Sequence, residues 1–162
     1  MKTYSGKYKV KDPSRYKGDH TNVVYRSMWE RQCFAWCENN SEIKEWSSEE
    51  IVVPYYYEID KKYHRYFIDL KITFNNGKTI LVEIKPEKET APPKRPDKTK
   101  RYLNEALTYV KNQNKWQAAN EFAKDRGWEF QIWTEKTLEK LNILPKALKP
   151  LKPLKPVKKI IK

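Results

Sequence analysis

The stretch that decides the fold is Tyr66-Phe67-Ile68-Asp69-Leu70, taken with the run Ile80-Leu81-Val82-Glu83-Ile84-Lys85. Both runs are apolar and rich in β-branched or aromatic residues, so each is predicted to form a half-buried strand. A charge inside such a strand costs free energy unless it is paired or binds a metal ion. Asp69, Glu83 and Lys85 are therefore the first candidates for a functional site.

The two runs are joined through Asn75-Asn76-Gly77, a strong signal for a β-hairpin. A two-residue turn would place Asp69 opposite Ile84, whereas a three-residue loop would place it opposite Glu83. The three-residue loop needs a residue in the left-handed conformation, which the glycine supplies. Side-chain alternation then puts Lys85 on the same face as Glu83. The loop chemistry thus permits the two carboxylates to converge.

The rest of the chain reads as an α/β domain. Helices are expected over residues 27–39 and 99–126 and after Thr134, and strands over residues 50–57, 63–74, 78–85 and 128–134. Ser27 and Glu30 fit a capping box at the first helix, and Gly127 fits a C-cap of the second. A break is expected near residues 112–114. The expected core positions of the second helix are Leu103, Leu107, Val110, Trp116, Ala119, Phe122 and Ala123.

The composition narrows the class of partner. The chain has 162 residues, enough for one domain with a real core. Its 34 Lys and Arg exceed its 21 Asp and Glu, so the net charge is +13 and favours a polyanion such as nucleic acid. The aromatic content of 14% argues against a wholly disordered basic protein. No apolar run approaches the roughly 20 residues of a membrane span, so no membrane partner is expected.

We expect three parts: a basic N-terminal arm (1–20), the main domain (21–142) and a Lys/Pro-rich tail (143–162). The tail repeats Leu-Lys-Pro with the period of polyproline II, which would line up its lysines. A solubilising disordered tail and an arm that contacts phosphates or a partner are equally open. Cys33 and Cys37 match no zinc or redox spacing and are expected to be reduced thiols.

The acids and the lysine suit metal-assisted hydrolysis of a phosphodiester. A divalent cation lowers the pKa of water and polarises a phosphoryl oxygen. Mg²⁺, with Mn²⁺ as the alternative, takes oxygen ligands, which Asp69, Glu83 and the Ile84 carbonyl would supply. Lys85 would hold or deprotonate the attacking water, or offset charge in the transition state. Glu30 would orient a water or bind a second ion.

Each residue also has a purely structural explanation. Glu30 closes a capping box, and Asp69 pairs with nearby Arg65 or Lys71. Glu83 and Lys85 lie on a solvated strand face. Singly, these explanations are the better ones. The order in the chain, a helical acid, a strand acid and then acid-x-lysine on the next strand, favours the catalytic interpretation.

Six stretches then carry a family resemblance: Tyr4-Ser5-Gly6-Lys7-Tyr8, Tyr25-Arg26-Ser27-Met28-Trp29-Glu30, Trp46-Ser47-Ser48-Glu49-Glu50, His64-Arg65-Tyr66-Phe67-Ile68-Asp69, Val82-Glu83-Ile84-Lys85-Pro86 and 115–130. In them the chain resembles the PD-(D/E)xK nuclease superfamily, and within it the head-completion nucleases of large contractile-tailed phages. The resemblance covers about residues 3–140. One departure is Ile68, which stands where the superfamily often has proline.

The resemblance implies a restriction-endonuclease-like core, a mixed β-sheet flanked by helices. It also implies magnesium-dependent DNA endonuclease activity late in virion assembly, after DNA packaging. Asp69 and Glu83 match its metal ligands, Lys85 its catalytic lysine and Glu30 its helical acid. The implied partners are DNA and phage portal, neck or head proteins. The implied location is the host cytoplasm during assembly, with retention in the virion also open.

A segment rich in proline and charge, residues 86–98, follows the candidate site. It is expected to be a long loop. Its basic residues and the start of the next helix are expected to contact the DNA backbone, namely Lys94, Arg95, Lys98 and Lys100. Two non-enzymatic functions stay open, a DNA-binding structural component of the head-neck junction and a basic DNA- or RNA-binding accessory protein. A binding protein gains little from acids that face phosphate, which favours the nuclease.

Overall fold

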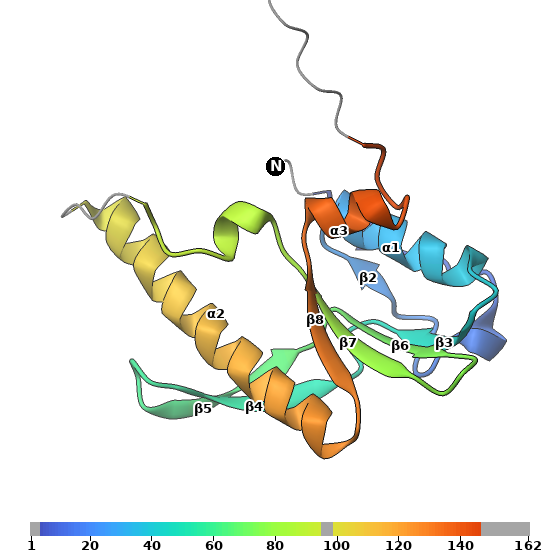
Figure 1. Ribbon diagram of the computed structural model, residues 1–162, viewed down its shortest axis with the longest axis horizontal. Coiled ribbons are helices and arrows are strands. Elements are labelled where there is room, and N and C mark those ends of the chain that lie inside the picture. The colour runs from blue at the N-terminus through green and yellow to red at the C-terminus, as the bar shows by residue number, and fades with distance from the viewer. Residues whose placement is uncertain (1–3, 95–98, 147–162) are drawn as a thin grey trace, which may run out of the picture.

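The computed structural model describes residues 4–94 and 99–146 (Figure 1). At its centre is a four-stranded mixed sheet in the order β3-β6-β7-β8. These strands are β3 (Ile43–Ser47), β6 (Leu70–Phe74), β7 (Thr79–Ile84) and β8 (Glu129–Trp133). β6 runs antiparallel to both of its neighbours, β3 and β7, whereas β8 runs parallel to β7. A parallel pair needs a long crossover, which the helix α2 (Lys100–Asp125) supplies.

One face of the sheet is covered by α1 (Met28–Asn39) and α3 (Glu135–Lys140). Phe34, Cys33 and Cys37 of α1 are fully buried, and Leu138 of α3 joins the same apolar cluster. Both cysteines are free thiols that fill this core, as the sequence predicts. This cluster positions the start of α1, and with it Glu30, beside the sheet.

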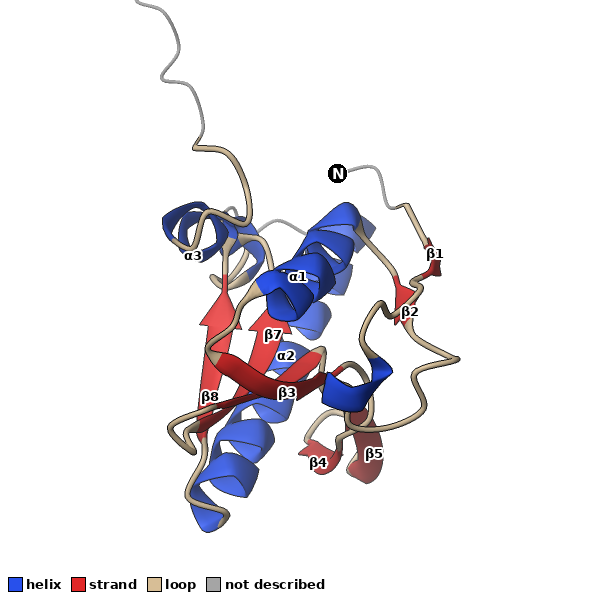
Figure 2. Ribbon diagram, turned by 90° about the vertical axis from the view of Figure 1, so that its right-hand side faces the viewer, coloured by secondary structure: helices blue, strands red, loops and turns tan. Residues whose placement is uncertain are grey.

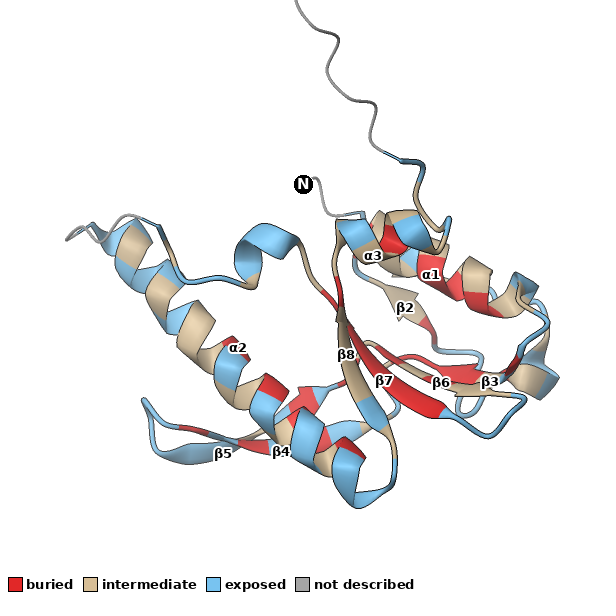
Figure 3. Cartoon of the chain, viewed as in Figure 1, coloured by how far each residue is buried: buried red, intermediate tan, exposed pale blue. Residues whose placement is uncertain are grey.

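The other face is covered by α2 and a two-stranded ribbon (Figures 1 and 2). The ribbon pairs β4 (Val52–Tyr57) with β5 (Lys62–Phe67). Trp116, Ala119 and Ala123 of α2 are buried against it and against the sheet. Because helices and a ribbon cover both faces, all six residues of β7 are buried (Figure 3).

The predicted register of the hairpin is confirmed. Leu70 pairs with Val82 and Thr73 with Thr79, so paired residue numbers sum to 152 as the three-residue loop requires. Gly77 has a φ of 89°, the left-handed conformation that this loop needs. One step beyond the last pair of the ladder, Asp69 and Glu83 stand opposite each other.

The single strand predicted over residues 63–74 is wrong, because the chain divides it into β5 and β6 at Ile68-Asp69. The Ile68 amide donates to the Ile51 carbonyl at 3.0 Å, and its carbonyl accepts from the Glu49 amide at 3.0 Å. These bonds hold a corner at which the chain leaves the ribbon and enters the central sheet. Asp69 lies at that corner. The strand β3, which the sequence analysis does not predict, forms the outer edge of the sheet.

The helix predictions are partly confirmed. Ser27 caps α1 by accepting from the Glu30 amide at 3.2 Å. The Glu30 carboxylate accepts from the Arg26 amide at 3.0 Å, one residue earlier than a regular capping box requires. The predicted break in α2 is wrong, because the helix runs unbroken through a buried Asn112. Leu103 and Leu107, predicted as core, are exposed.

The segment 4–20 is extended but packs onto the domain. β1 (Gly6–Lys7) pairs with β2 (Val24–Tyr25), and two 3-10 turns (Pro13–Arg15 and Glu87–Glu89) are the remaining elements that the structure describes. Val10 and Tyr16 are buried in the core under α1. The Arg15 guanidinium donates to four carbonyls between the last turn of α1 and the start of β3, those of Cys37, Glu38, Asn40 and Ile43. The division at residues 20 and 142 stays a prediction, and most of the Lys/Pro tail lies outside the described residues. None of the described helices is long and apolar enough to cross a membrane.

Candidate active site

Asp69, Glu83 and Lys85 converge where β6 begins and β7 ends. The Ile84 amide donates to Asp69 Oδ2 at 2.8 Å, which ties the corner residue to the end of β7. Lys85 Nζ lies 3.6 Å from Glu83 Oε1. The hairpin register and the corner at Ile68 therefore bring together the three residues that the sequence singles out.

Tyr66 fixes the position of Glu83. The Glu83 side chain is buried, and the Tyr66 hydroxyl donates to its Oε2 at 2.5 Å. Burial, followed by the negative charge of Glu83, raises the pKa of Tyr66 far above its usual range, so the phenol remains a donor. Tyr66 on one oxygen and Lys85 near the other together fix the position of the Glu83 side chain.

Asp69 occupies an unfavourable place for a carboxylate. Its pKa is raised well above the ordinary value by burial and then by the charge of Glu83, while the Ile84 amide offsets part of this. The pairing of Asp69 with Arg65 or Lys71, which the sequence permits, is absent from the described residues. Arg65 lies over Phe67, and Lys71 lies over the Trp128 ring at 4.7 Å. A bound cation would relieve the repulsion between the two acids.

Glu30 lies near the other acids at the start of α1. Burial raises its pKa, and the charges of Glu49 and Glu83 raise it further, whereas the hydrogen bond from the Arg26 amide lowers it. Glu30 therefore belongs to the same electrostatic cluster. Its carboxylate also carries the capping bond, so the structural and the chemical explanation of this residue hold together.

The structure adds two features that the sequence analysis does not predict at this site. Lys115 of α2 lies in the cleft with its Nζ 5.4 Å from the centroid of the Tyr66 ring. Burial lowers its pKa, and the charge of Glu83 offsets part of that effect. Glu49 takes a left-handed φ of 55° and binds Arg26 through N–O contacts of 2.9 and 3.3 Å. The available signal for Lys115 is its place on the buried stripe of α2, four residues before Ala119.

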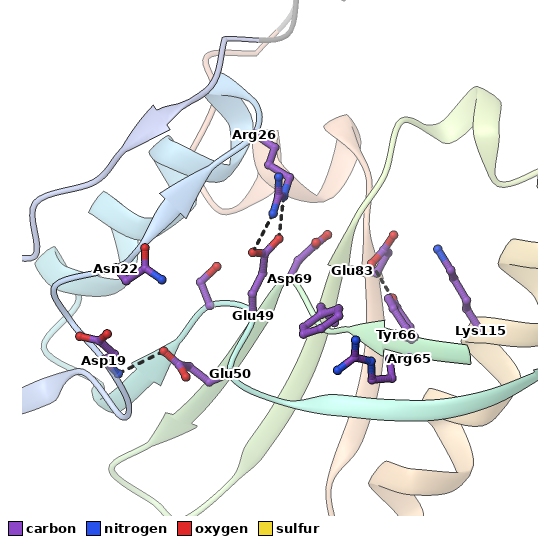
Figure 4. A pocket seen from close by; sticks show the side chains of 12 residues that line it. Asp19, Asn22, Arg26, Glu49, Glu50, Arg65, Tyr66, Asp69, Glu83 and Lys115 are labelled. Atoms are coloured by element: carbon purple, nitrogen blue, oxygen red, sulfur yellow. Dashed lines mark hydrogen bonds and ion pairs between the residues drawn. The ribbon is translucent and has the colours of Figure 1, made fainter. Parts of the chain in front are cut away.

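Asp69, Glu83 and Lys115 line an open cleft of about 650 Å³ (Figure 4). Glu30 and Lys85 are not among its lining residues. Acidic and basic groups face it together, which suits a ligand that is an anion held through a cation. The lining residues are Asp19, Asn22, Arg26, Ser48, Glu49, Glu50, Arg65, Tyr66, Phe67, Asp69, Glu83 and Lys115.

The donors at the cleft suit a hard cation. No three His, Cys, Asp or Glu side chains in residues 4–94 and 99–146 form a complete ligand cluster. Asp69 and Glu83 nevertheless offer two carboxylates, and the Ile84 carbonyl is a candidate third oxygen. Mg²⁺ is commonly bound by one or two carboxylates, with water and phosphate oxygens completing the shell. The arrangement fits that mode of binding.

The predicted DNA contacts lie elsewhere and remain predictions. Lys94 and Lys100 are exposed on either side of the gap in the described residues. Arg95 and Lys98 lie outside the described residues. Lys94 and Lys100 are absent from the lining of the cleft.

The mixed sheet, its flanking helices and the acids at the corner define a restriction-endonuclease-like protein. Residues 40–135 match the family described as TnsA-like endonuclease N terminal. Over 143 residues the chain is 42% identical to the head completion nuclease of Enterobacteria phage T4, an alignment that covers 85% of this chain and 95% of that protein. The chain belongs to this nuclease family. The match to residues 40–135 contains Asp69, Glu83, Lys85 and Lys115, whereas Glu30 lies before it.

Proposed function

We propose that the protein is a divalent-metal-dependent DNA endonuclease that acts in phage head completion after DNA packaging. The observation that carries the proposal is the convergence of Asp69 and Glu83, with Lys85 Nζ 3.6 Å from Glu83 Oε1. Membership of the nuclease family supports the reaction, and the name of the T4 relative supports the role in head completion.

In this proposal Asp69, Glu83 and the Ile84 carbonyl hold the cation, with Mg²⁺ the first candidate and Mn²⁺ the second. When bound, the cation would lower the pKa of a water molecule and polarise a phosphoryl oxygen. Lys85 orients that water and offsets charge in the transition state. Tyr66 keeps Glu83 in place, and Glu30 orients a water at the edge of the site. The corner and the hairpin set the positions of Asp69, Glu83 and Lys85, and α1 sets that of Glu30.

Lys115 has the position of a phosphate-binding residue in this scheme. Its half-buried ammonium faces the same cleft from α2, opposite the β7 residues. A cation there offers charge-assisted hydrogen bonds to a DNA phosphate. The net charge of +13, with Lys94, Arg95, Lys98 and Lys100 as candidate contacts, supports sequence-independent binding to the backbone.

The proposed partners are DNA and the portal, neck or head proteins of a phage particle. The proposed place of action is the host cytoplasm during virion assembly, and a protein retained in the virion would serve the same role. Enzyme and assembly functions are compatible, because a nuclease that trims protruding DNA must act at the filled head.

A plasmid-nicking assay with Mg²⁺ tests the proposal. We expect the wild type to cleave and Asp69→Ala, Lys85→Ala and added chelator each to abolish cleavage. Lys44→Ala, which removes an exposed lysine of β3, is the matched control and should cleave normally. If the protein binds DNA but does not cleave it at any metal or salt concentration, the proposed endonuclease activity is overturned. That result would favour a DNA-binding structural component of the head-neck junction.

A further inference from the structure

The outer face of the β4–β5 ribbon carries an unusual line of apolar and aromatic side chains. The inner face packs on α2, so the strands alternate between buried and exposed residues. On the outer face the direct cross-strand pairs are Val52 with Phe67, Pro54 with Arg65, and Tyr56 with Tyr63. Tyr63 is 76% exposed, and Tyr56 and Phe67 are each 45% exposed. Single exposed apolar residues are normal, but a continuous line of them marks a binding surface.

This line of side chains, the ribbon strip, begins at the cleft. Phe67 and Arg65 line the cleft together with Asp69 and Glu83. Residues 63, 65 and 67 alternate onto the outer face of β5, and Asp69 follows Phe67 at the corner. From Phe67 to Tyr63 the strip is about 13 Å long, at about 3.3 Å per residue. That length matches two to four nucleotides of a single strand, at roughly 3.4 Å or more per nucleotide.

The chemistry of the ribbon strip suits unpaired bases. Aromatic rings stack on bases of any sequence, and arginine contacts phosphates or stacks in turn. The Arg65 guanidinium lies 5.7 Å from the centroid of the Phe67 ring, and the Tyr56 and Tyr63 rings meet edge to face at 5.3 Å. The bases of an intact duplex are stacked on each other and cannot offer their faces to these rings.

We propose that the ribbon strip is a stacking platform for an unpaired DNA strand, which it guides into the cleft. The inference rests on the proposed nuclease function and deepens it, because it makes DNA with a single-stranded segment the preferred substrate. The occupant is argued from the continuity of the strip with the cleft and from the positive charge of the chain. The acids Glu58 and Asp60 mark the far end of the platform, where Asp60 is bound to His64 at 2.6 Å.

Binding measurements in the presence of chelator test the platform without cleavage. Fluorescence anisotropy would compare a labelled 20-nucleotide oligothymidine with a 20-base-pair duplex. Tyr63→Ala and Tyr56→Ala should each weaken binding of the single strand by about 5- to 30-fold, the effect of losing one stacked base. Binding of the duplex should change by less than about twofold, because it rests on phosphate contacts.

Two further variants sharpen the test. Tyr63→Phe keeps the ring and should retain single-strand affinity, whereas Tyr4→Ala removes an exposed tyrosine outside the ribbon and should have no effect. Equal losses for single strand and duplex, or no loss with Tyr63→Ala, would overturn the platform. If the ribbon strip binds a protein instead, Tyr63→Ala should not weaken binding of the single strand.

The platform and the nuclease can fail separately. A protein that never nicks plasmid but loses single-strand affinity in Tyr63→Ala would keep the platform and refute the proposed enzyme. A protein that nicks normally and cuts flapped DNA no faster than duplex, in wild type and Tyr63→Ala alike, would keep the enzyme and refute the platform.

Discussion

Replacing Asp69 by asparagine should make the metal-free protein more stable at neutral pH. Asp69 stands opposite Glu83 at the end of the β6–β7 ladder, and burial and the charge of Glu83 raise its pKa. Asparagine keeps the shape and can still accept from the Ile84 amide. The substitution therefore removes a buried charge that destabilises the metal-free fold.

The magnitude follows from the geometry. The Cβ atoms of directly opposed residues on neighbouring strands are about 5 Å apart. Two unit charges separated by that distance repel by about 3 kcal/mol at an effective dielectric constant of about 20. The variant loses about 1 kcal/mol of this advantage, because the neutral amide oxygen of asparagine is a weaker acceptor than a carboxylate. The net gain is about 2 kcal/mol, or about 6 °C in Tm at roughly 3 °C per kcal/mol.

The gain should depend on pH with a definite sign. The pKa of Asp69 is higher in the folded than in the unfolded protein, so the unfolded chain releases its proton first as pH rises. The free energy of unfolding of the wild type therefore falls from about pH 4 upward, through the folded pKa. The variant lacks this loss. The difference in free energy of unfolding between variant and wild type therefore grows as pH rises and disappears at acid pH.

Thermal unfolding between pH 4 and pH 8, with chelator and with Mg²⁺, is the measurement. Saturating Mg²⁺ should stabilise the wild type by about 2.7 kcal/mol at a hundredfold excess over Kd, and the variant by less. Asp125→Asn, at the exposed end of α2, is the matched control and should show neither effect. A variant less stable than wild type in chelator at pH 7.5, or a difference independent of pH, would refute the electrostatic argument. Equal stabilisation of both by Mg²⁺ would refute Asp69 as a ligand.

Three other variants test the surroundings of the site. Lys115→Met keeps the apolar stem and should slow single-turnover cleavage about 10- to 100-fold, since a charge-assisted contact contributes about 1.5–3 kcal/mol; an unchanged rate would remove Lys115 from the site. Tyr66→Phe leaves Glu83 without its donor, so urea unfolding in chelator should show a loss of about 1–3 kcal/mol, and no loss would contradict the bond. Gly77→Ala should cost about 1–2 kcal/mol through backbone strain alone, with normal nicking below its Tm, because a Cβ there meets no neighbouring atom; lost nicking in a folded protein would count against this.

The hairpin could be predicted from the sequence because its determinants are local. A glycine at the third position of the loop selects one register, and that register places Asp69 opposite Glu83. Ser27 likewise caps α1 through a bond to an amide three residues away. Such features depend on neighbours in the chain and need no knowledge of the rest of the fold.

The corner at Ile68 could not be predicted in this way. Residues 63–74 alternate as one strand, and the bonds that divide it come from Glu49 and Ile51 in a separate segment. The edge strand β3 escaped prediction for a related reason. Its sequence Ile-Lys-Glu-Trp-Ser carries two adjacent charges, and the ladder with β6 is irregular between Ile43 and Glu45.

The long helix shows the limit of periodicity as a guide. Its apolar stripe predicts which face is inward, and Trp116, Ala119 and Ala123 are buried accordingly. The first half of α2 leads away from the central sheet, and Leu103 and Leu107 there remain exposed (Figure 3). Lys115 lies on the same stripe, but the sequence alone does not show that the stripe borders a cleft at this point.

The corner explains why the ribbon strip and the acids belong to one site. A straight strand from Tyr63 to Phe74 would keep its alternating faces. It could not, however, both pack on α2 through residues 63–67 and join the central sheet through residues 70–74. The bend at Ile68 permits both, and it leaves Phe67 and Asp69 lining the same cleft. Phe67 and Asp69 are separated by Ile68 alone, so an exposed ring and a carboxylate stand close together on either side of the corner. Because Asp69 is also tied to the Ile84 amide, the position of the ring relative to the acids depends on the bonds at Ile68 and on no flexible loop.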